Sequence, residues 1–337
     1  MSESTVKSEY TNLPPLILRY QRVIDPARCT YGVQRQAHTT PENFEWQMRY
    51  LKDNYYVMDL ETALTAYIKG QRLPNKSVVL TFDGGWIDTF VYAFPVLHRL
   101  GLATSVFLLT DFIGTSRFIW PDMVHFALQI LQAKEKKFIP FSFFNEEICA
   151  LLREASPDGE INYQLINLVI LALAAAPGED RFIGAQALCN YAAELGGQLP
   201  LEQAFMDWEE ISIMEGQGVK FGSLGHQYVF FNDLNEKQSI TEIEGSYAVL
   251  KRYIANPSNV FCFPEGVPGQ FGLKAAKLKG AFAALGERSL VEEEEFSESI
   301  PIFSRIPISE ATVQNEKGFK DLLERKFKKP VEVSGNS

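Results

Sequence analysis

The clearest candidate for chemistry in this sequence is a single carboxylate at the end of an apolar run. Residues 78 to 88 read V-V-L-T-F-D-G-G-W-I-D, so Asp83 stands where a predicted strand gives way to a glycine turn. Loops at the carboxyl ends of parallel strands carry the chemistry of α/β folds, and an acid placed there can serve as a general base or bind a ligand. It can also be a structural acid that accepts backbone N–H bonds from the turn or caps the helix that follows. Both interpretations of Asp83 stay open.

Two more loops carry polar and aromatic side chains after predicted strands. His226 lies in S-L-G-H-Q-Y-V-F-F, residues 223 to 231, and Glu265 lies in F-P-E-G, residues 263 to 266. His226 is a candidate catalytic partner of Asp83, and it can equally be a solvent-facing loop residue or a donor to a sugar. Trp86, Tyr228, Phe230 and Phe231 are candidates for a sugar-stacking surface, although aromatic side chains are more often buried.

Strand and helix patterns alternate around these loops. Short apolar runs typical of buried parallel strands occupy 13–20, 55–58, 76–82, 103–110, 219–223 and 260–264. Patterns typical of helices occupy 40–51, 59–70, 88–101, 207–218 and 234–254, several with a cap residue before them or glycine after them. The alternation predicts an α/β fold with a parallel sheet covered on both sides, either a barrel or a doubly wound sheet.

The alternation of strand and helix patterns is interrupted once. Residues 121–207 hold helical runs with little strand pattern and are predicted to be a helical insertion in a domain that spans 14–315. Residues 1–13 are interpreted as a flexible leader, and 316–337 as a C-terminal helix and polar tail.

Composition excludes some functions. The formal net charge is -10, so there is no basic field to attract a phosphate backbone, and nucleic acid is not an expected partner. Neither a signal-peptide core nor an apolar run of transmembrane length is visible, which predicts a cytoplasmic protein with no membrane span. The four cysteines form no C-x-x-C pair and are interpreted as reduced core thiols.

The motifs together resemble the polysaccharide deacetylases of the NodB-homology family, similar to carbohydrate esterase family 4. T-F-D-G-G-W-I-D resembles T-F-D-D-G-Y of that family, F-G-S-L-G-H-Q-Y resembles F-G-S-H-T-x-S-H, and F-C-F-P-E-G resembles F-A-Y-P-x-G. L-I-L-R-Y-Q-R-V and S-R-I-P-I are similar to its first and last strands, so the resemblance covers residues 15 to about 308. It implies an irregular (β/α) barrel that removes acetyl groups from sugars with a divalent metal.

The same resemblance places the expected metal ligands on unsuitable residues. The family's base falls on Asp83, and its three ligands fall on Gly84, Leu224 and Tyr228. Glycine and leucine offer no ligand atom, and a phenol with a pKa near 10 replaces imidazole poorly. Gln21 stands where the family usually has histidine at the end of its first strand. We therefore expect no metal and no other cofactor, and we expect that restoring Asp, His and His at the three positions would create metal affinity.

Three functional hypotheses follow from the resemblance. The first is a protein of bacterial surface-glycan metabolism that binds an acetylated sugar or glycan precursor as a pseudoenzyme, with Gln21, Trp86, Tyr228, Phe230 and Glu265 as binding residues. The second is a metal-independent hydrolase of a C–N or acetyl ester bond that uses Asp83 and His226. The third is a structural partner whose helical insertion contacts other proteins of glycan biosynthesis.

Overall fold

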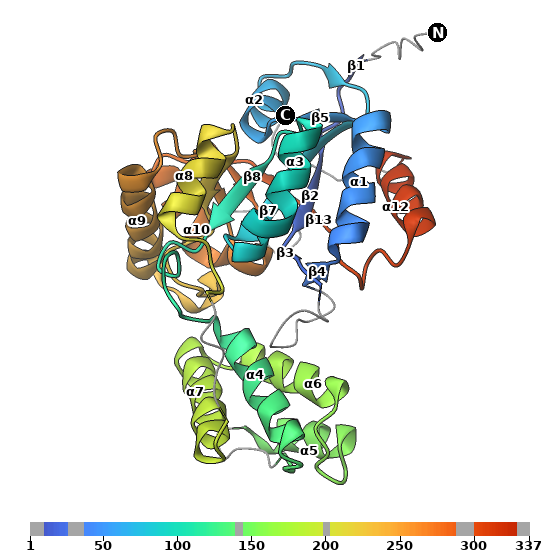
Figure 1. Ribbon diagram of the computed structural model, residues 1–337. Coiled ribbons are helices and arrows are strands. Elements are labelled where there is room, and N and C mark those ends of the chain that lie inside the picture. The colour runs from blue at the N-terminus through green and yellow to red at the C-terminus, as the bar shows by residue number, and fades with distance from the viewer. Residues whose placement is uncertain (1–9, 26–36, 139–143, 198–202, 288–299, 329–337) are drawn as a thin grey trace. The chain divides into compact units, whose positions relative to one another are not determined.

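The computed structural model describes residues 10–25, 37–138, 144–197, 203–287 and 300–328 (Figure 1). The chain divides into two compact units. The first comprises Met1–Asp25, Gln34–Thr115 and Gln203–Ser337, and the second comprises Pro26–Val33 and Ser116–Glu202.

The first unit is built around a curled parallel sheet. Its strands are β2 (Leu16–Tyr20), β5 (Tyr56–Met58), β7 (Ser77–Gly84), β8 (Ser105–Leu108), β9 (Lys220–Ser223), β10 (Val260–Cys262), β11 (Ala283–Leu285), β12 (Ile302–Phe303) and β13 (Ile306–Pro307). Their order in the described sheet is β12-β11-β10-β9-β8-β7-β2-β13, with β5 also pairing with β7. All of these ladders are parallel, and every residue of β7 is buried. This confirms the predicted deacetylase-type (β/α) barrel.

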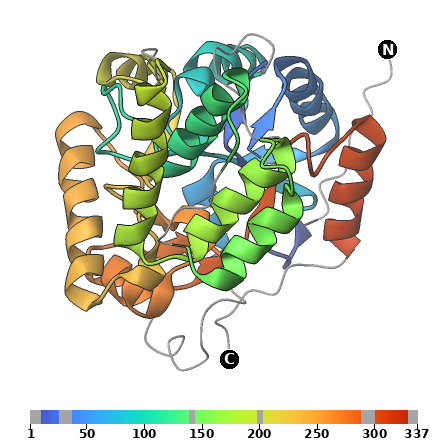
Figure 2. The ribbon, with the colours of Figure 1, turned by 90° about the horizontal axis from the view of Figure 1, so that it is seen from below.

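Helices surround the strands of this unit. They are α1 (Pro41–Asn54), α2 (Leu60–Ile68), the π-helical turn η2 (Thr89–Ala93), α3 (Phe94–Leu100), α8 (Trp208–Gly216), α9 (Glu236–Tyr253), α10 (Gly269–Leu278) and α12 (Glu316–Lys328). In both ribbon views α9 and α12 lie on opposite sides of the sheet (Figures 1 and 2). The predicted C-terminal helix packs on α1 through Phe319, whose ring lies edge-on to Trp46 at 5.5 Å.

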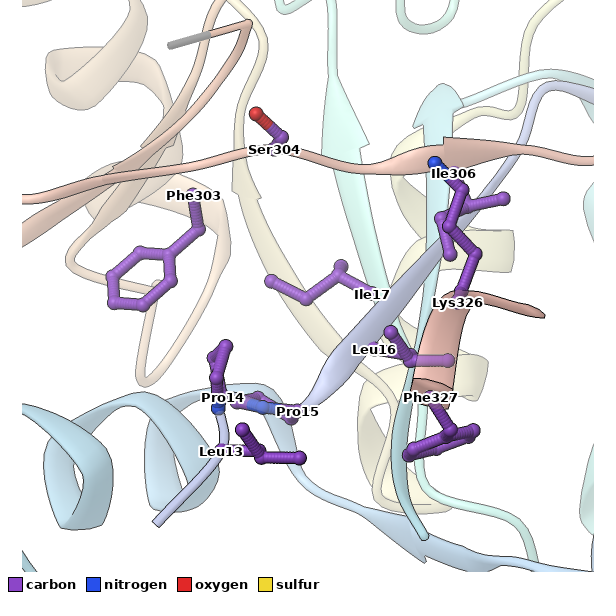
Figure 3. A pocket seen from close by; sticks show the side chains of 10 residues that line it. All are labelled: Leu13, Pro14, Pro15, Leu16, Ile17, Phe303, Ser304, Ile306, Lys326 and Phe327. Atoms are coloured by element: carbon purple, nitrogen blue, oxygen red, sulfur yellow. The ribbon is translucent and has the colours of Figure 1, made fainter. Parts of the chain in front are cut away.

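The two edge strands of the sheet are neighbours in the sequence. β12 ends at Phe303 and β13 begins at Ile306, although the two strands stand at opposite ends of the strand order. Ser304 and Arg305 therefore bridge the seam of the curled sheet. A small apolar cavity, about 20 Å³, lies beside this seam and is lined by residues of β2, β12, β13 and α12 (Figure 3). The Leu16 and Ile17 side chains that line it come from the start of β2, the end opposite to the candidate site.

The register brings the ends of neighbouring strands level with one another. Gly84 of β7 pairs with Leu108 of β8, and Leu108 pairs with Ser223 of β9. Ser223 is in turn level with Phe261 of β10. The loops that follow these strands are therefore placed side by side at one end of the sheet, as expected for a parallel α/β architecture.

The structure changes two of the segment boundaries expected from the sequence, that of the N-terminal leader and that of the helical insertion. Tyr10–Thr11, the end of the predicted leader, forms β1 and pairs antiparallel with β6 (Leu73–Pro74), while residues 1–9 lie outside the described residues. Residues 203–207, assigned above to the insertion, group with the first unit because they pair with the turn after β7.

The described part of the second unit is helical. It contains α4 (Trp120–Ala133), α5 (Glu146–Ala155), α6 (Tyr163–Ala175) and α7 (Gly178–Glu194). Arg181 of α7 is 4% exposed and donates to the carbonyls of Leu173, Ala174 and Ala176 at the C-terminal end of α6, where helix carbonyls lack further intrahelical N–H donors. Cys149, Cys189 and Cys262 are free and buried, whereas Cys29 lies outside the described residues. In the described part of the chain, none of the helices combines the length and the apolarity that a membrane crossing needs.

The buried imidazole of His125 on α4 makes the stability of the protein depend on pH. Burial lowers the pKa of His125 to about 4, and its Nδ1 has no hydrogen-bond partner among the described residues. The unfolded chain, with an ordinary histidine pKa, takes up this proton more readily, so stability is lost as pH falls from about 6.5 toward 4. We expect the unfolding free energy at pH 5 to be about 2 kcal/mol lower than at pH 7.5 from this group alone.

Urea unfolding of the His125→Leu variant at the two pH values measures this contribution. The variant should lose that part of the pH dependence, whereas His98→Gln, which changes an exposed histidine, should keep it. Equal pH dependence in the wild type and His125→Leu would contradict the prediction.

Candidate functional site

Asp83 is held by an arginine that the sequence analysis did not single out. Both oxygens of the Asp83 carboxylate accept from Arg305, at 2.6 Å for Nη1 to Oδ1 and 2.7 Å for Nη2 to Oδ2. The side chains are 10% and 3% exposed, respectively. This bidentate arrangement, with two parallel charge-assisted hydrogen bonds, is among the strong pairings of a carboxylate with a guanidinium. The negative charge of Asp83 is therefore paired with the positive charge of Arg305, and both carboxylate oxygens already accept hydrogen bonds.

The surroundings of Arg305 favour its charged form. Burial acts to lower the pKa of Arg305, but the neighbouring Asp83 carboxylate, with a smaller effect of Glu265, offsets burial and raises that pKa above the ordinary arginine value. Cys262 lies at the end of β10 with its Sγ 3.7 Å from Asp83 Oδ1. Burial raises the pKa of the Cys262 thiol well above its usual range, so the thiol stays protonated and can donate weakly to the carboxylate.

The neighbouring position, Gly84, has no room for the second acid of the deacetylase motif. Its φ of +103° lies in a region that L-residues rarely adopt, and a Cβ built there would lie 2.5 Å from Nε1 of Trp86. The indole cannot easily move, because it is 2% exposed and stacks on Phe205 at 4.2 Å between ring centroids. The guanidinium of Arg22 also lies 4.2 Å from the centre of the same indole.

Trp86 is thus a packed residue, which corrects the expectation that it lies on an exposed sugar-stacking surface. Asp88, four residues after Gly84, is buried as well. It forms an ion pair with Arg22 and accepts from the Val23 N–H at 2.9 Å. Asp88 stands at the start of η2 but does not cap it with its side chain, and it is instead a buried partner of Arg22.

The residues at this end of the sheet do not fit the divalent metal that the deacetylase fold implies. Leu224 is 4% exposed, and glycine and leucine have no ligand atom. Tyr228 donates its hydroxyl to Glu265. Within the described residues, no three His, Cys, Asp or Glu side chains are grouped so that they could hold an ion. The expectation that three substitutions would restore metal affinity needs correction, because Trp86 also stands in the way at position 84.

His226 lies in a separate polar cluster at the ends of β8 and β9. Its Nδ1 is 2.9 Å from the Thr110 hydroxyl, and its Nε2 is 4.0 Å from Asp111 Oδ1. Glu242 of α9 accepts from the backbone N–H groups of His226 and Gln227, each at 2.6 Å. Burial raises the pKa of Glu242 to about 7, against the effect of these two N–H donors. Glu242 therefore fixes the loop that carries His226.

Three of the remaining predicted binding residues, Tyr228, Phe230 and Glu265, form a half-exposed to exposed rim. Tyr228 and Phe230 are half-buried, with ring centroids 6.0 Å apart, and the Tyr228 hydroxyl donates to Oε1 of exposed Glu265 at 2.5 Å. Glu265 has φ +51°, a left-handed conformation that is uncommon outside glycine and often marks a functional loop. Gln21 is half-buried between β2 and β3 (Arg22–Val23).

The site residues therefore fall into three groups: the buried pair of Asp83 and Arg305, the polar cluster around His226, and the rim of Tyr228, Phe230 and Glu265. Glu265 connects the rim to the buried pair, since its charge contributes to the raised pKa of Arg305. No hydrogen bond or ion pair between described residues joins Asp83 to His226. Arg305 and Glu242 were missed by sequence reasoning. The one available signal for Arg305 was a charged residue inside the otherwise apolar run P-I-F-S-R-I-P-I.

Comparisons with known proteins agree with this architecture. The solved structures of the Streptococcus pyogenes deacetylase PplD and of IcaB from Ammonifex degensii match with TM-scores of 0.52 and 0.53. Each match covers 93% of this chain and 96% of the other, at 15% and 13% identity. BC0361, a polysaccharide deacetylase from Bacillus cereus, matches with a TM-score of 0.55 at 15% identity, over 93% of this chain and 69% of that one.

The sequence comparison is more limited. The "Putative polysaccharide deacetylase YxkH" of Bacillus subtilis (strain 168) is 31% identical over 74 residues, which is 22% of this chain and 26% of that relative. No protein-family model matches the sequence. Together the comparisons show that this chain has the fold of the polysaccharide deacetylases, and a shared fold does not by itself establish a shared activity.

Substitution of Gly84 tests the packing at the second-acid position. Gly84→Ala should destabilise the protein through both backbone strain and overlap with Trp86. Gly218→Ala is the matched control, because Gly218 has φ +91° and nothing within 4 Å of the added Cβ. We expect Gly84→Ala to lower the unfolding free energy by about 1 to 3 kcal/mol more than Gly218→Ala, measured by urea unfolding. Equal losses would mean that Trp86 does not restrict position 84.

Substitution of Asp83 tests the buried ion pair. Asp83→Asn leaves the Arg305 guanidinium without its countercharge, and we expect a loss of about 3 kcal/mol in unfolding free energy. The double variant Asp83→Asn/Arg305→Gln should recover part of this loss. Glu45→Gln, which removes a charge from the exposed cluster with Arg49 and Arg99, should change stability by less than about 1 kcal/mol. A full loss that persists in the double variant would argue against the pair as the cause.

Proposed function

We propose that this chain is a polysaccharide deacetylase-like protein of surface-glycan metabolism that binds an acetylated sugar or glycan precursor without ordinary metal-dependent deacetylation. The observation that carries the proposal is position 84, where a positive-φ glycine covered by Trp86 stands in place of a ligating acid. Metal-assisted hydrolysis depends on an ion that polarises the carbonyl and activates water, and three protein ligands are the usual minimum for a catalytic zinc.

The rim supports recognition of a sugar. Tyr228 and Phe230 offer half-buried aromatic rings, and the Tyr228 hydroxyl and Glu265 offer polar atoms beside them, while Gln21 at the end of β2 is a further candidate binding residue. Aromatic faces beside a few fixed hydrogen-bonding groups are typical of small-molecule sites. Two of the neighbouring structures, BA0330 and BC0361, are named as polysaccharide deacetylases, which favours a carbohydrate as the ligand. We further propose that the protein is cytoplasmic. We also propose that its helical insertion contacts other proteins of glycan biosynthesis.

Metal-independent hydrolysis through Asp83 and His226 is less well supported. Asp83 has both oxygens occupied by Arg305, and His226 is engaged with Thr110. A general base and its partner need to reach the same reacting group, and these two side chains have separate sets of contacts.

Three measurements on the full chain test the proposal. Elemental analysis after zinc soaking should find no stoichiometric zinc, and acetylated chitooligosaccharides should release no acetate. Calorimetric titration with the same oligosaccharides should detect binding. Phe230→Ala should weaken it about threefold to tenfold, because an aromatic contact contributes about 0.5 to 1.5 kcal/mol.

Tyr56→Ala, which removes an aromatic ring that is 54% exposed on β5, is the control and should leave the affinity unchanged. Absence of binding to any acetylated hexosamine would contradict the carbohydrate proposal. Stoichiometric zinc together with acetate release that is lost in Asp83→Asn would overturn the pseudoenzyme proposal.

A further inference from the structure

The chain segment that returns from the second unit is bound directly to the turn after β7. This return segment is Gln203–Asp207, the first residues after Glu202. The Ile87 N–H donates to the Ala204 carbonyl and the Met206 N–H donates to the Gly85 carbonyl, each at 2.9 Å. The two segments thus run antiparallel, with Trp86 opposite Phe205.

Side chains reinforce this pairing. The Phe205 ring lies almost parallel to the Trp86 indole, with 22° between the planes, and is 0% exposed. Phe112 packs against Phe205 from the chain that leads toward the second unit, at 5.2 Å between centroids. The Gly114 N–H donates to the Met206 carbonyl at 2.9 Å. The two chain segments that flank Ser116–Glu202, one ending at Thr115 and the other beginning at Gln203, are therefore hydrogen-bonded to one another next to the Trp86 turn.

The position of the Trp86 indole carries an energetic penalty, because it buries a hydrogen-bond donor. Its Nε1 is buried and has no hydrogen-bond partner among the described residues. A buried donor without an acceptor destabilises the folded state, because the water it gives up on burial is not replaced. The stacking with Phe205 and the contact with Arg22 must offset that cost, so the position of the indole depends on what packs against it.

We propose that the return segment acts as a strap. Phe205 holds the Trp86 indole over Gly84, and the space beside Asp83 becomes accessible only when the strap releases the indole. In the sequence, the strap directly follows the last residues of the second unit. The inference concerns the closure of the site and does not depend on which ligand the site takes.

The accessibility of Trp86 tests the strap. A full-length variant with Trp46, Trp120 and Trp208 changed to phenylalanine retains Trp86 as its only tryptophan. In this background, Phe205→Ala should increase acrylamide quenching of Trp86 fluorescence at least threefold. Phe319→Ala is the matched control, because Phe319 is also 0% exposed but packs against Trp46 and Tyr50. It should leave the quenching unchanged.

Hydrogen exchange provides a second measurement in the chain with all four tryptophans. In Phe205→Ala the amides of Ile87 and Met206 should exchange at least tenfold faster than in the wild type, and in Phe319→Ala they should not. Trp86 that stays protected in Phe205→Ala, or that opens equally in both variants, would overturn the proposal. Neither measurement uses a sugar or a metal, so a failed strap and a failed carbohydrate proposal give different results.

Discussion

The buried pair between Arg305 and Asp83 is the interaction on which this end of the barrel depends. Arg305 belongs to the two-residue link between β12 and β13, the strands at the two edges of the curled sheet. Asp83 ends β7, which pairs with β2, β5 and β8 and is buried throughout. The pair therefore ties the seam of the sheet to its centre. A guanidinium that is 3% exposed requires a countercharge, and Asp83 supplies it.

This constraint separates the polar groups into two sets. Asp83 with Arg305, and Asp88 with Arg22, are buried charges that neutralise each other. The Tyr228, Phe230 and Glu265 side chains form a half-exposed to exposed rim that a ligand can reach. Chemistry that needs a free charge cannot draw on the first set without breaking a buried pair. Recognition by the rim carries no such cost, which is consistent with the binding role proposed for it.

Much of the fold could be read from the sequence, because it rests on local patterns. Apolar runs such as K-S-V-V-L-T-F predicted strands, and the alternation with capped helices predicted the parallel barrel. The contacts that define the site are not local. Arg305 is 222 residues from Asp83, so its role follows from how the sheet closes. The burial of Trp86 likewise depends on Phe205, which arrives only after the helical segment, and no pattern around Trp86 reveals that cover.

The change at position 84 then has a physical consequence beyond the loss of a ligand. In this backbone a side chain at position 84 and the indole at position 86 exclude each other, since a Cβ on residue 84 would lie 2.5 Å from Nε1. Glycine at 84 permits both the positive φ of the turn and the close approach of Trp86. Trp86 in that place offers the flat surface on which Phe205 stacks. A single glycine therefore links the absence of the second acid to the attachment of the strap, and the altered site and the return from the second unit form one packed arrangement.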